Sequence, residues 1–229
     1  GSERIAALLV ATNTACVIHS HFGTADMLYC LQLYLFAWCV LAGFPLVAAA
    51  LAGFAMATKF GLIAIPSLVL LTASVPSRRD KALVPLTAVF AFFAAQGFAF
   101  NGASADAIWR SFTQDNAGGF EHANALNLIA YAGVFVRSLG LPVAGLAVAS
   151  VLHWKRKKVE LQTWIALLPF ALHGLGLLLI HTAFPRHALP LIPLACIAAA
   201  ARLTTHDKHR LLLTTLCACW SLALAWSDG

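Results

Sequence analysis

The chain has 229 residues, of which 61% are hydrophobic and only 10% charged, and its mean hydropathy is +0.82. A soluble domain carries about 25% charged residues, so this composition excludes a soluble globular protein, a disordered chain and a cysteine-rich secreted scaffold. The formal net charge of +6 does not indicate a nucleic-acid partner, because the basic residues stand in short clusters between apolar runs, where they act as topology signals.

Hydropathy divides the chain into apolar runs that predict an all-α, polytopic bundle of about nine transmembrane helices in a single domain of residues 1–229. The runs cover residues 4–18, 27–43, 44–58, 60–76, 82–100, 126–152, 161–183, 187–201 and 211–226. The six cysteines lie within apolar segments, so we interpret them as small buried hydrophobes rather than as disulfide or zinc ligands.

The first run begins after Gly1-Ser2-Glu3-Arg4 and lacks a clear signal-peptide cleavage site, so we interpret it as a span. The connection that follows it contains His19, His21 and Asp26. A carboxylate beside a membrane is costly, which makes Asp26 a candidate for holding a metal ion or polarising an acceptor hydroxyl. The alternative is an N-cap of the helix that follows. The histidines fit interfacial polar groups better than metal ligands, and His21 is kept as a candidate substrate contact.

The third and fourth runs meet at Lys59. Joined into one helix they would measure about 50 Å, too long for one crossing, so the sequence predicts a hairpin of two short helices. An ammonium group surrounded by apolar sequence needs an anion, which makes Lys59 a candidate phosphate contact. The alternative is a side chain that snorkels to the membrane interface.

The longest connection runs from Asn101 to about Gly140. A polar stripe, formed by Asn124, Asn127, Tyr131 and Ser138, predicts a helix along the membrane interface before Gly140-Leu-Pro142 starts the crossing. One long tilted span is the alternative. Farther on, His173 and His181 lie one helical face apart, and we interpret them as helix-packing residues.

Arg186 and His187 stand at the start of the eighth run, at a depth equivalent to that of Lys59. Arg186 through its planar fork and Lys59 as a point charge could together clamp a phosphate. Snorkelling is again the alternative.

The charges separate the connections into two sides. One side collects 11 of the 15 basic residues, so the positive-inside rule predicts that it is cytoplasmic. The other side holds Asp26, Lys59 and Arg186, so most of the polar chemistry is expected to be extracytoplasmic. The basic side carries Arg4, Arg78, Arg79, Lys81, Lys155, Arg156, Lys157, Lys158, Arg202, Lys208 and Arg210.

Three segments together carry a resemblance to a known family: "SHFGTADMLYCLQLYLFAWCVLAG" ending at Gly43, "LAGFAMATKFGLIAIPSLVLL" at 51–71, and "FPRHALPLIPLACIAAA" at 184–200. They resemble the GT-C type glycosyltransferases that use polyprenyl phosphates, in particular the protein O-mannosyltransferase and lipid A aminoarabinose transferase group. The resemblance implies a multi-pass enzyme, in a bacterial inner membrane, that transfers a sugar from a polyprenyl-phosphate donor to a hydroxyl of a lipid, glycan or protein.

The resemblance also implies residue roles. Asp26 matches the acidic residue that helps to bind a divalent metal ion or organise the site, Lys59 matches the lysine that meets the donor phosphate, and Arg186 matches the arginine of the family's "RY-x-x-P" motif. His187 replaces the tyrosine of that motif. Family members begin with a further span and an acidic outer loop, so we expect this chain to be an N-terminally truncated fragment that cannot transfer sugar alone.

Two other classes of function compete with this reading. In a transporter or lipid flippase, Asp26, Lys59 and Arg186 would line a passage; transporters, however, usually show repeats and polar residues near mid-membrane. A non-catalytic scaffold would leave the cost of the ionisable residues unexplained.

Overall fold

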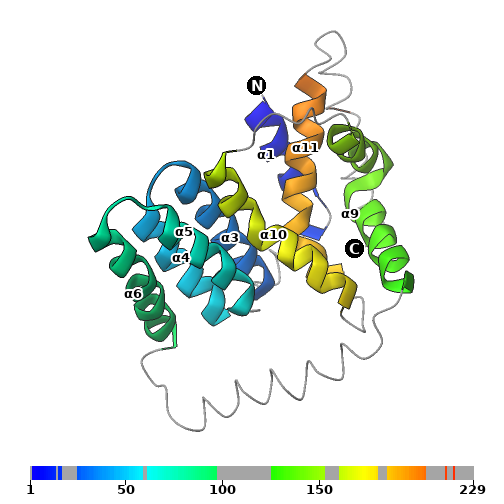
Figure 1. Ribbon diagram of the computed structural model, residues 1–229. Helices are drawn as coiled ribbons and strands as arrows, with labels where there is room; N and C mark the ends of the chain where they lie inside the picture. The colour runs from blue at the N-terminus through cyan, green and yellow to red at the C-terminus, as the bar shows by residue number, and fades with distance from the viewer. Residues whose placement is uncertain are drawn as a thin grey trace. The chain divides into compact units, whose positions relative to one another are not determined.

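The computed structural model describes residues 2–13, 15–16, 25–58, 61–96, 125–152, 160–179 and 185–204, together with Thr215 and Cys219. Throughout these ranges the chain is helical, with turns between helices and no strand, which confirms the all-α fold class (Figure 1). The chain divides into two compact units. Unit 1 comprises residues 1–27, 125–157 and 183–229, and unit 2 comprises residues 28–124 and 158–182.

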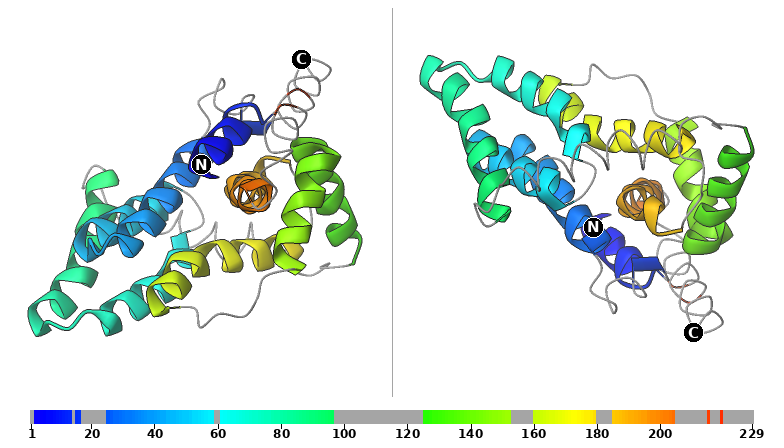
Figure 2. Two further views of the ribbon diagram at one scale, coloured as in Figure 1. Left: turned by 90° about the horizontal axis from the view of Figure 1, so that it is seen from above. Right: turned by 90° about the horizontal axis from the view of Figure 1, so that it is seen from below.

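Unit 1 is built around α11 (Ile192–Thr204), which packs against both α1 (Ser2–Ala11) and α9 (Ala125–Leu152). Figure 2 shows α11 end-on between these two helices. The short 3-10 helix η3 (Pro185–Leu191) leads into α11 and also contacts α9. Small and branched apolar side chains fill the core, whose buried members are Leu9, Ala15, Cys16, Leu139, Val143, Ala147, Leu189, Ile192, Cys196, Ala199, Ala200 and Leu203.

The helices of unit 1 have defined directions. The Ser150 hydroxyl donates a hydrogen bond to the carbonyl oxygen of Ala198 at 2.6 Å, while η3, at the start of α11, contacts α9 as well. Ser150 lies near the end of α9, so in an antiparallel pair η3 would lie beyond that end and could not contact α9. The two helices therefore run parallel, as Figure 1 shows. α1 runs antiparallel to them. If α9 and α11 cross a membrane, the chain between them has to cross back.

A kink divides α9 at Gly140, whose φ of 73° and ψ of 153° are not helical. The break lies where the sequence predicted it, at Gly140-Leu-Pro142. Two features deprive the Ser138 carbonyl of its helical donor: the kink itself, and Pro142, which has no N–H to offer four residues later. The Asn13 side chain supplies the missing donor, because its Nδ2 lies 2.6 Å from the Ser138 carbonyl oxygen.

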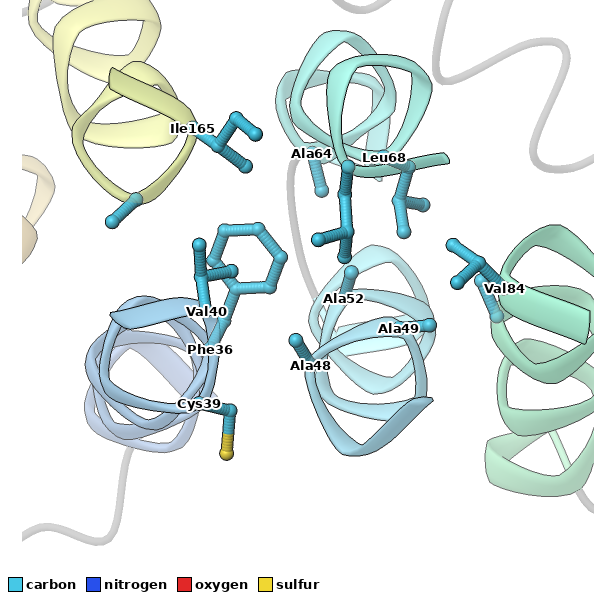
Figure 3. Packing of buried hydrophobic residues seen from close by; sticks show 13 residues of the cluster. Phe36, Cys39, Val40, Ala48, Ala49, Ala52, Ala64, Leu68, Val84 and Ile165 are labelled. Atoms are coloured by element: carbon cyan, nitrogen blue, oxygen red, sulfur yellow. The ribbon is translucent and has the colours of Figure 1, made fainter. Parts of the chain in front are cut away.

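Unit 2 is a cluster of short apolar helices with small side chains between them. Its elements are α3 (Ala25–Leu41, whose first three residues belong to unit 1), α4 (Pro45–Thr58), η1 (Gly61–Ala64), α5 (Ile65–Ser74), α6 (Arg78–Ala95) and α10 (Leu161–Leu179). Figure 3 shows Phe36 and Val40 of α3 facing the alanines of α4, and Val84 of α6 facing Ala49 from the other side.

α4 and α6 make the closest helix contact in unit 2. A Cβ atom added to Gly53 would collide with the carbonyl oxygen of Ala88 and lie 2.9 Å from the Cβ of Ala91, so only glycine fits here. The Gln96 side chain donates from Nε2 to the Ala57 carbonyl oxygen at 3.2 Å. Residue numbers therefore rise together along both helices, which run parallel. Close approach over small residues is typical of helix packing in membranes.

Two tight turns connect the helices of unit 2. Gly43, with a φ of 78°, forms the turn between α3 and α4, a conformation that glycine adopts without steric cost. Ser77 caps α6, its hydroxyl accepting a hydrogen bond from the backbone N–H of Asp80 at 3.4 Å. The sequence-predicted hairpin around Lys59 is confirmed at the level of the helices, because α4 and α5 are separate and contact each other.

Two helical stretches in the described ranges are long and apolar enough to cross a membrane, namely Ile129–Leu152 and Arg186–Leu203. The apolar helices α3, α4, α5 and α10 are shorter in their hydrophobic extent. The nine-span bundle is therefore still a proposal. One side of α3 nevertheless exposes a continuous apolar stripe, opposite the side that carries the buried Tyr29, Leu33 and Phe36. The stripe consists of Leu28, Leu31, Leu35, Trp38 and Leu41.

Candidate functional site

Four polar side chains of unit 1 lie at one end, which we call the polar end and define by Asn13, Ser138, Arg186 and His187. Ser150 pairs with Ala198, so on parallel helices Ser138 lies near the level of η3, which carries Arg186 and His187. Asn13 lies there too, because it is bonded to Ser138. Residues from three distant stretches of sequence are thus brought to one end of one unit.

Asn13 holds this end together from a fully buried position, with a relative exposure of 1%. Besides donating to Ser138, its side chain accepts through Oδ1 a hydrogen bond from the backbone N–H of Cys16 at 3.2 Å, as an N-cap does. Both halves of the amide are satisfied, so its orientation is set by two bonds. In the sequence, Asn13 is only a polar interruption of the first apolar run. The available signal was Pro142, four residues after an otherwise helical carbonyl.

Arg186 and His187 are the first polar residues of η3, between Pro185 and the fully buried Ala188 and Leu189. Arg186 is exposed and His187 half-buried. A guanidinium group on an exposed side chain has the planar geometry for bidentate contact with a phosphate. The sequence-predicted contact of Arg186 with a donor phosphate stays a prediction.

Asp26 lies in the first turn of α3 and has a relative exposure of 8%. The helix begins at Ala25, so Asp26 lies inside the first turn and not at the N-cap position that was its alternative role. A carboxylate in a first turn interacts favourably with the helix dipole. Its neighbour Met27 packs against the core of unit 1. Asp26, Arg186 and His187 thus belong to the same unit.

The opposite end of unit 1 is basic. Arg4 lies in the first turn of α1 and Arg202 in the last turn of α11, and because these helices are antiparallel the two arginines share one end. α9 also ends there, at Leu152, three residues before the basic sequence run that begins at Lys155. The prediction that Arg4 and Arg202 lie on the same side thus agrees with the helix directions inside unit 1.

Two of the four residues in the sequence-predicted polar stripe of α9 have described side chains. Tyr131 and Ser138 are both buried, whereas Asn124 lies outside the described residues. Arg137, which the sequence analysis did not single out, is exposed beside the kink. The placement of the first half of α9 along a membrane interface stays a prediction.

Lys59 and His21 lie outside the described residues, as does His19. Lys59 belongs by sequence to unit 2, whereas Arg186 belongs to unit 1. The phosphate clamp formed by Lys59 and Arg186 therefore stays a prediction.

For metal binding, the described ranges contain no group of three or more His, Cys, Asp or Glu side chains placed to hold an ion. Asp26 could supply one oxygen ligand to a hard divalent cation, and such a cation would draw its other ligands from water, substrate or residues outside these ranges. The divalent ion is retained as an expectation from the resemblance.

A second set of buried polar groups lies within unit 2. His173, buried on α10, has its ring centroid 6.0 Å from that of Tyr29 on α3, with the rings tilted by 44°. This contact bears out the expectation that His173 packs between helices. Ser67 Oγ on α5 and Gln32 Oε1 on α3 are buried and make no hydrogen bond. Three of these residues did not stand out in the sequence, because each is isolated in an apolar run: Tyr29, Gln32 and Ser67.

Comparison with known proteins yields no relative: no protein-family model, no curated protein and no solved structure matches the chain.

Proposed function

We propose that the protein is an integral membrane glycosyltransferase that takes a sugar from a polyprenyl-phosphate donor and transfers it to a hydroxyl acceptor on the extracytoplasmic face of a bacterial inner membrane. The observation that carries this proposal is the polarity of unit 1. An exposed arginine, a half-buried histidine and a buried carboxylate belong to the unit that carries basic residues at its other end. By the positive-inside rule, the end with Arg4 and Arg202 faces the cytoplasm.

The proposed chemistry is a single displacement at the anomeric carbon of the sugar. The bond from this carbon to the donor phosphate oxygen breaks, the acceptor oxygen forms a new bond to the same carbon, and the acceptor proton passes to a carboxylate. Arg186 would hold the leaving phosphate, with Lys59 as a second cation and with His187 and His21 as further substrate contacts. Asp26 would orient the acceptor hydroxyl or one divalent ion beside it.

Donor binding is the first test, because it needs the cation and not the complete catalytic machinery. The chain in lipid nanodiscs is titrated with a polyprenyl phosphate and, for comparison, with the uncharged polyprenol. Arg186→Gln is expected to weaken phosphate binding about tenfold, equivalent to about 1.4 kcal/mol, and to leave polyprenol binding unchanged. Arg137→Gln, which removes another exposed arginine of unit 1, is the matched control and should bind within about twofold of wild type.

Equal donor affinity in wild type and Arg186→Gln would contradict the proposed role of the arginine. Asp26→Asn then separates binding from chemistry in the full-length protein. Donor affinity should be preserved, whereas sugar transfer should fall by about 10²–10⁴-fold if the carboxylate handles the proton. Lys59→Ala is tested in the same titration, and unchanged affinity would identify Lys59 as an interfacial anchor.

A transporter or flippase is the second candidate, and one observation favours it. Unit 2 buries Tyr29, Ser67 and His173 within its helices, where polar side chains are costly and often mark a transport path. Transfer of a fluorescent polyprenyl phosphate across proteoliposome membranes tests this function. Transport that is abolished by His173→Leu and unaffected by Asp26→Asn would favour the transporter over the glycosyltransferase.

A further inference from the structure

A surface groove of about 380 Å³ lies between α9 and the pair η3–α11 in unit 1. All of its lining side chains are apolar. The groove uses residues on both sides of the α9 kink, since Phe135 precedes Gly140 and Val148 follows it. The kink thus helps to form a concave surface where two straight packed helices would leave a shallower seam.

The groove is most open toward the basic end. Val151 and Leu152, the last lining residues of α9, are 63% and 77% exposed. Along η3 and α11, the lining residues Leu191 (the last residue of η3), Ala195 and Ala198 (both on α11) recur at offsets of four and three. The same helical stripe continues four residues later to Arg202, about one turn or 6 Å beyond the groove.

An apolar groove that ends at a cation matches the chemistry of an anionic amphiphile. We propose that this groove holds an acyl chain of an anionic bilayer phospholipid, with the lipid phosphate at Arg202. Basic residues at the cytoplasmic ends of transmembrane helices favour anionic headgroups, and the apolar lining offers the chain no polar group that would have to be desolvated. The proposal rests on the membrane placement of unit 1, and it does not depend on sugar transfer.

The position of the cation decides between two sources of lipid phosphate. The donor of the proposed reaction would place its phosphate at Arg186, at the polar end, whereas the open part of the groove lies at the other end beside Arg202. We therefore assign the groove to a phospholipid of the cytoplasmic leaflet and not to the polyprenyl donor. The two ligands should bind without competing.

The test uses the chain in detergent with phosphatidylglycerol and phosphatidylcholine of identical acyl chains, and measures bound lipid by native mass spectrometry. Wild type should retain phosphatidylglycerol at least fivefold better than phosphatidylcholine, and Arg202→Gln should abolish this preference. Ala195→Phe, which fills the groove, should lower binding of both lipids. Ile197→Phe is the matched control, because Ile197 is exposed on α11 and does not line the groove.

Photocrosslinking of the wild-type protein with a photoactivatable phosphatidylglycerol gives a second measurement, which does not depend on whether a variant folds. Crosslinks should concentrate in 135–152 and 191–198; an even distribution over all helices would overturn the proposal. Displacement of the phospholipid by polyprenyl phosphate would overturn it in favour of the donor. A disulfide between Ala195→Cys and Cys219 would overturn it in favour of the chain's own C-terminal segment. Failure of donor binding in the Arg186 titration would leave these lipid results unaffected, so the two proposals fail separately.

Discussion

The two units are held together by different means. Unit 2 relies on shape, because Gly53 and the alanines of α4 allow α6 to approach until its backbone is in contact. Unit 1 adds a buried hydrogen bond between distant segments, from Asn13 to Ser138, whose partners are 125 residues apart in sequence, whereas the bond from Gln96 of unit 2 to the Ala57 carbonyl oxygen is exposed. In a chain made mostly of apolar helices, two features thus determine which helices pair. One is a small residue that lets two backbones approach closely, and the other is a hydrogen bond to a backbone group that a helix break leaves without its partner.

The largest expected effect tests packing by shape in unit 2. Gly53→Ala should lower the free energy of unfolding by about 1–3 kcal/mol and Gly53→Leu by more, because the added atoms meet the Ala88 backbone, which cannot rotate away. Thermal unfolding in detergent measures both. Gly176→Ala is the control in the same unit, since an added Cβ there has no neighbour within 4 Å. If Gly53→Leu unfolds at the wild-type temperature, close packing does not hold unit 2 together.

The next effect tests the polar bond of unit 1. Asn13→Ala removes the donor of the buried Ser138 carbonyl and the cap on Cys16, and should cost about 1–3 kcal/mol. Asn13→Asp should restore only part of this loss, because it keeps the acceptor and lacks the donor. Thr12→Ala is the neighbouring control, since its hydroxyl bonds only to carbonyls of its own helix. Equal stabilities of the Asn13 and Thr12 variants would contradict the proposed role of Asn13.

A smaller effect concerns the contact between α9 and α11. Ser150→Ala deletes the bond to the Ala198 carbonyl oxygen and should cost about 0.5–1.5 kcal/mol. Thr72→Ala in unit 2 loses a bond of similar length, 2.7 Å, that stays within one helix, and should cost less. The comparison is made by chemical unfolding in detergent. A larger loss of stability in Thr72→Ala than in Ser150→Ala would contradict the importance of the hydrogen bond between α9 and α11.

The smallest effect is a pH dependence at the basic end of unit 1. The backbone N–H of Glu3, at the start of α1, holds the pKa of its carboxyl below the ordinary value of 4.5. Because the pKa of Glu3 is lower in the folded than in the unfolded protein, its carboxylate stabilises the folded state fully above the unfolded-state pKa. This stabilisation is lost as the pH falls through the folded-state pKa. Glu3→Gln should therefore flatten a small decline in stability below about pH 4.5. NMR titration of Glu3 with a pKa at or above 4.5 would contradict this.

Much of the secondary structure could be predicted from the sequence. Periodic apolar runs predicted helices, and local breakers marked their ends: Gly43 between α3 and α4, and Gly140 with Pro142 in α9. These signals act within a few residues, so they can be read without knowing the fold. The N-cap alternative for Asp26 was wrong, because α3 already includes Ala25 and Asp26, whereas an N-cap at Asp26 would start the helix at Met27.

The candidate site was predictable only in part. Arg186 and Asp26 stood out because charged residues are rare in apolar sequence. Asn13 did not stand out, because its importance depends on a carbonyl that a distant proline and a distant glycine leave without a donor. The pairing of α4 with α6 also depends on residues that are distant in sequence, because Gly53 of α4 has to fit against the backbone at Ala88 of α6.

The sequence by itself therefore determined the helical composition, the breaks between helices and the separation of basic from other polar residues along the chain, since all three follow from local hydropathy and backbone chemistry. Only the tertiary structure decided which helices pack together, that α9 and α11 run parallel, and that Asn13, Ser138 and Arg186 share one end of unit 1. Apolar helices of similar composition can pair in many ways, and the choice among them depends on surface shape and on single polar bonds that local periodicity does not encode.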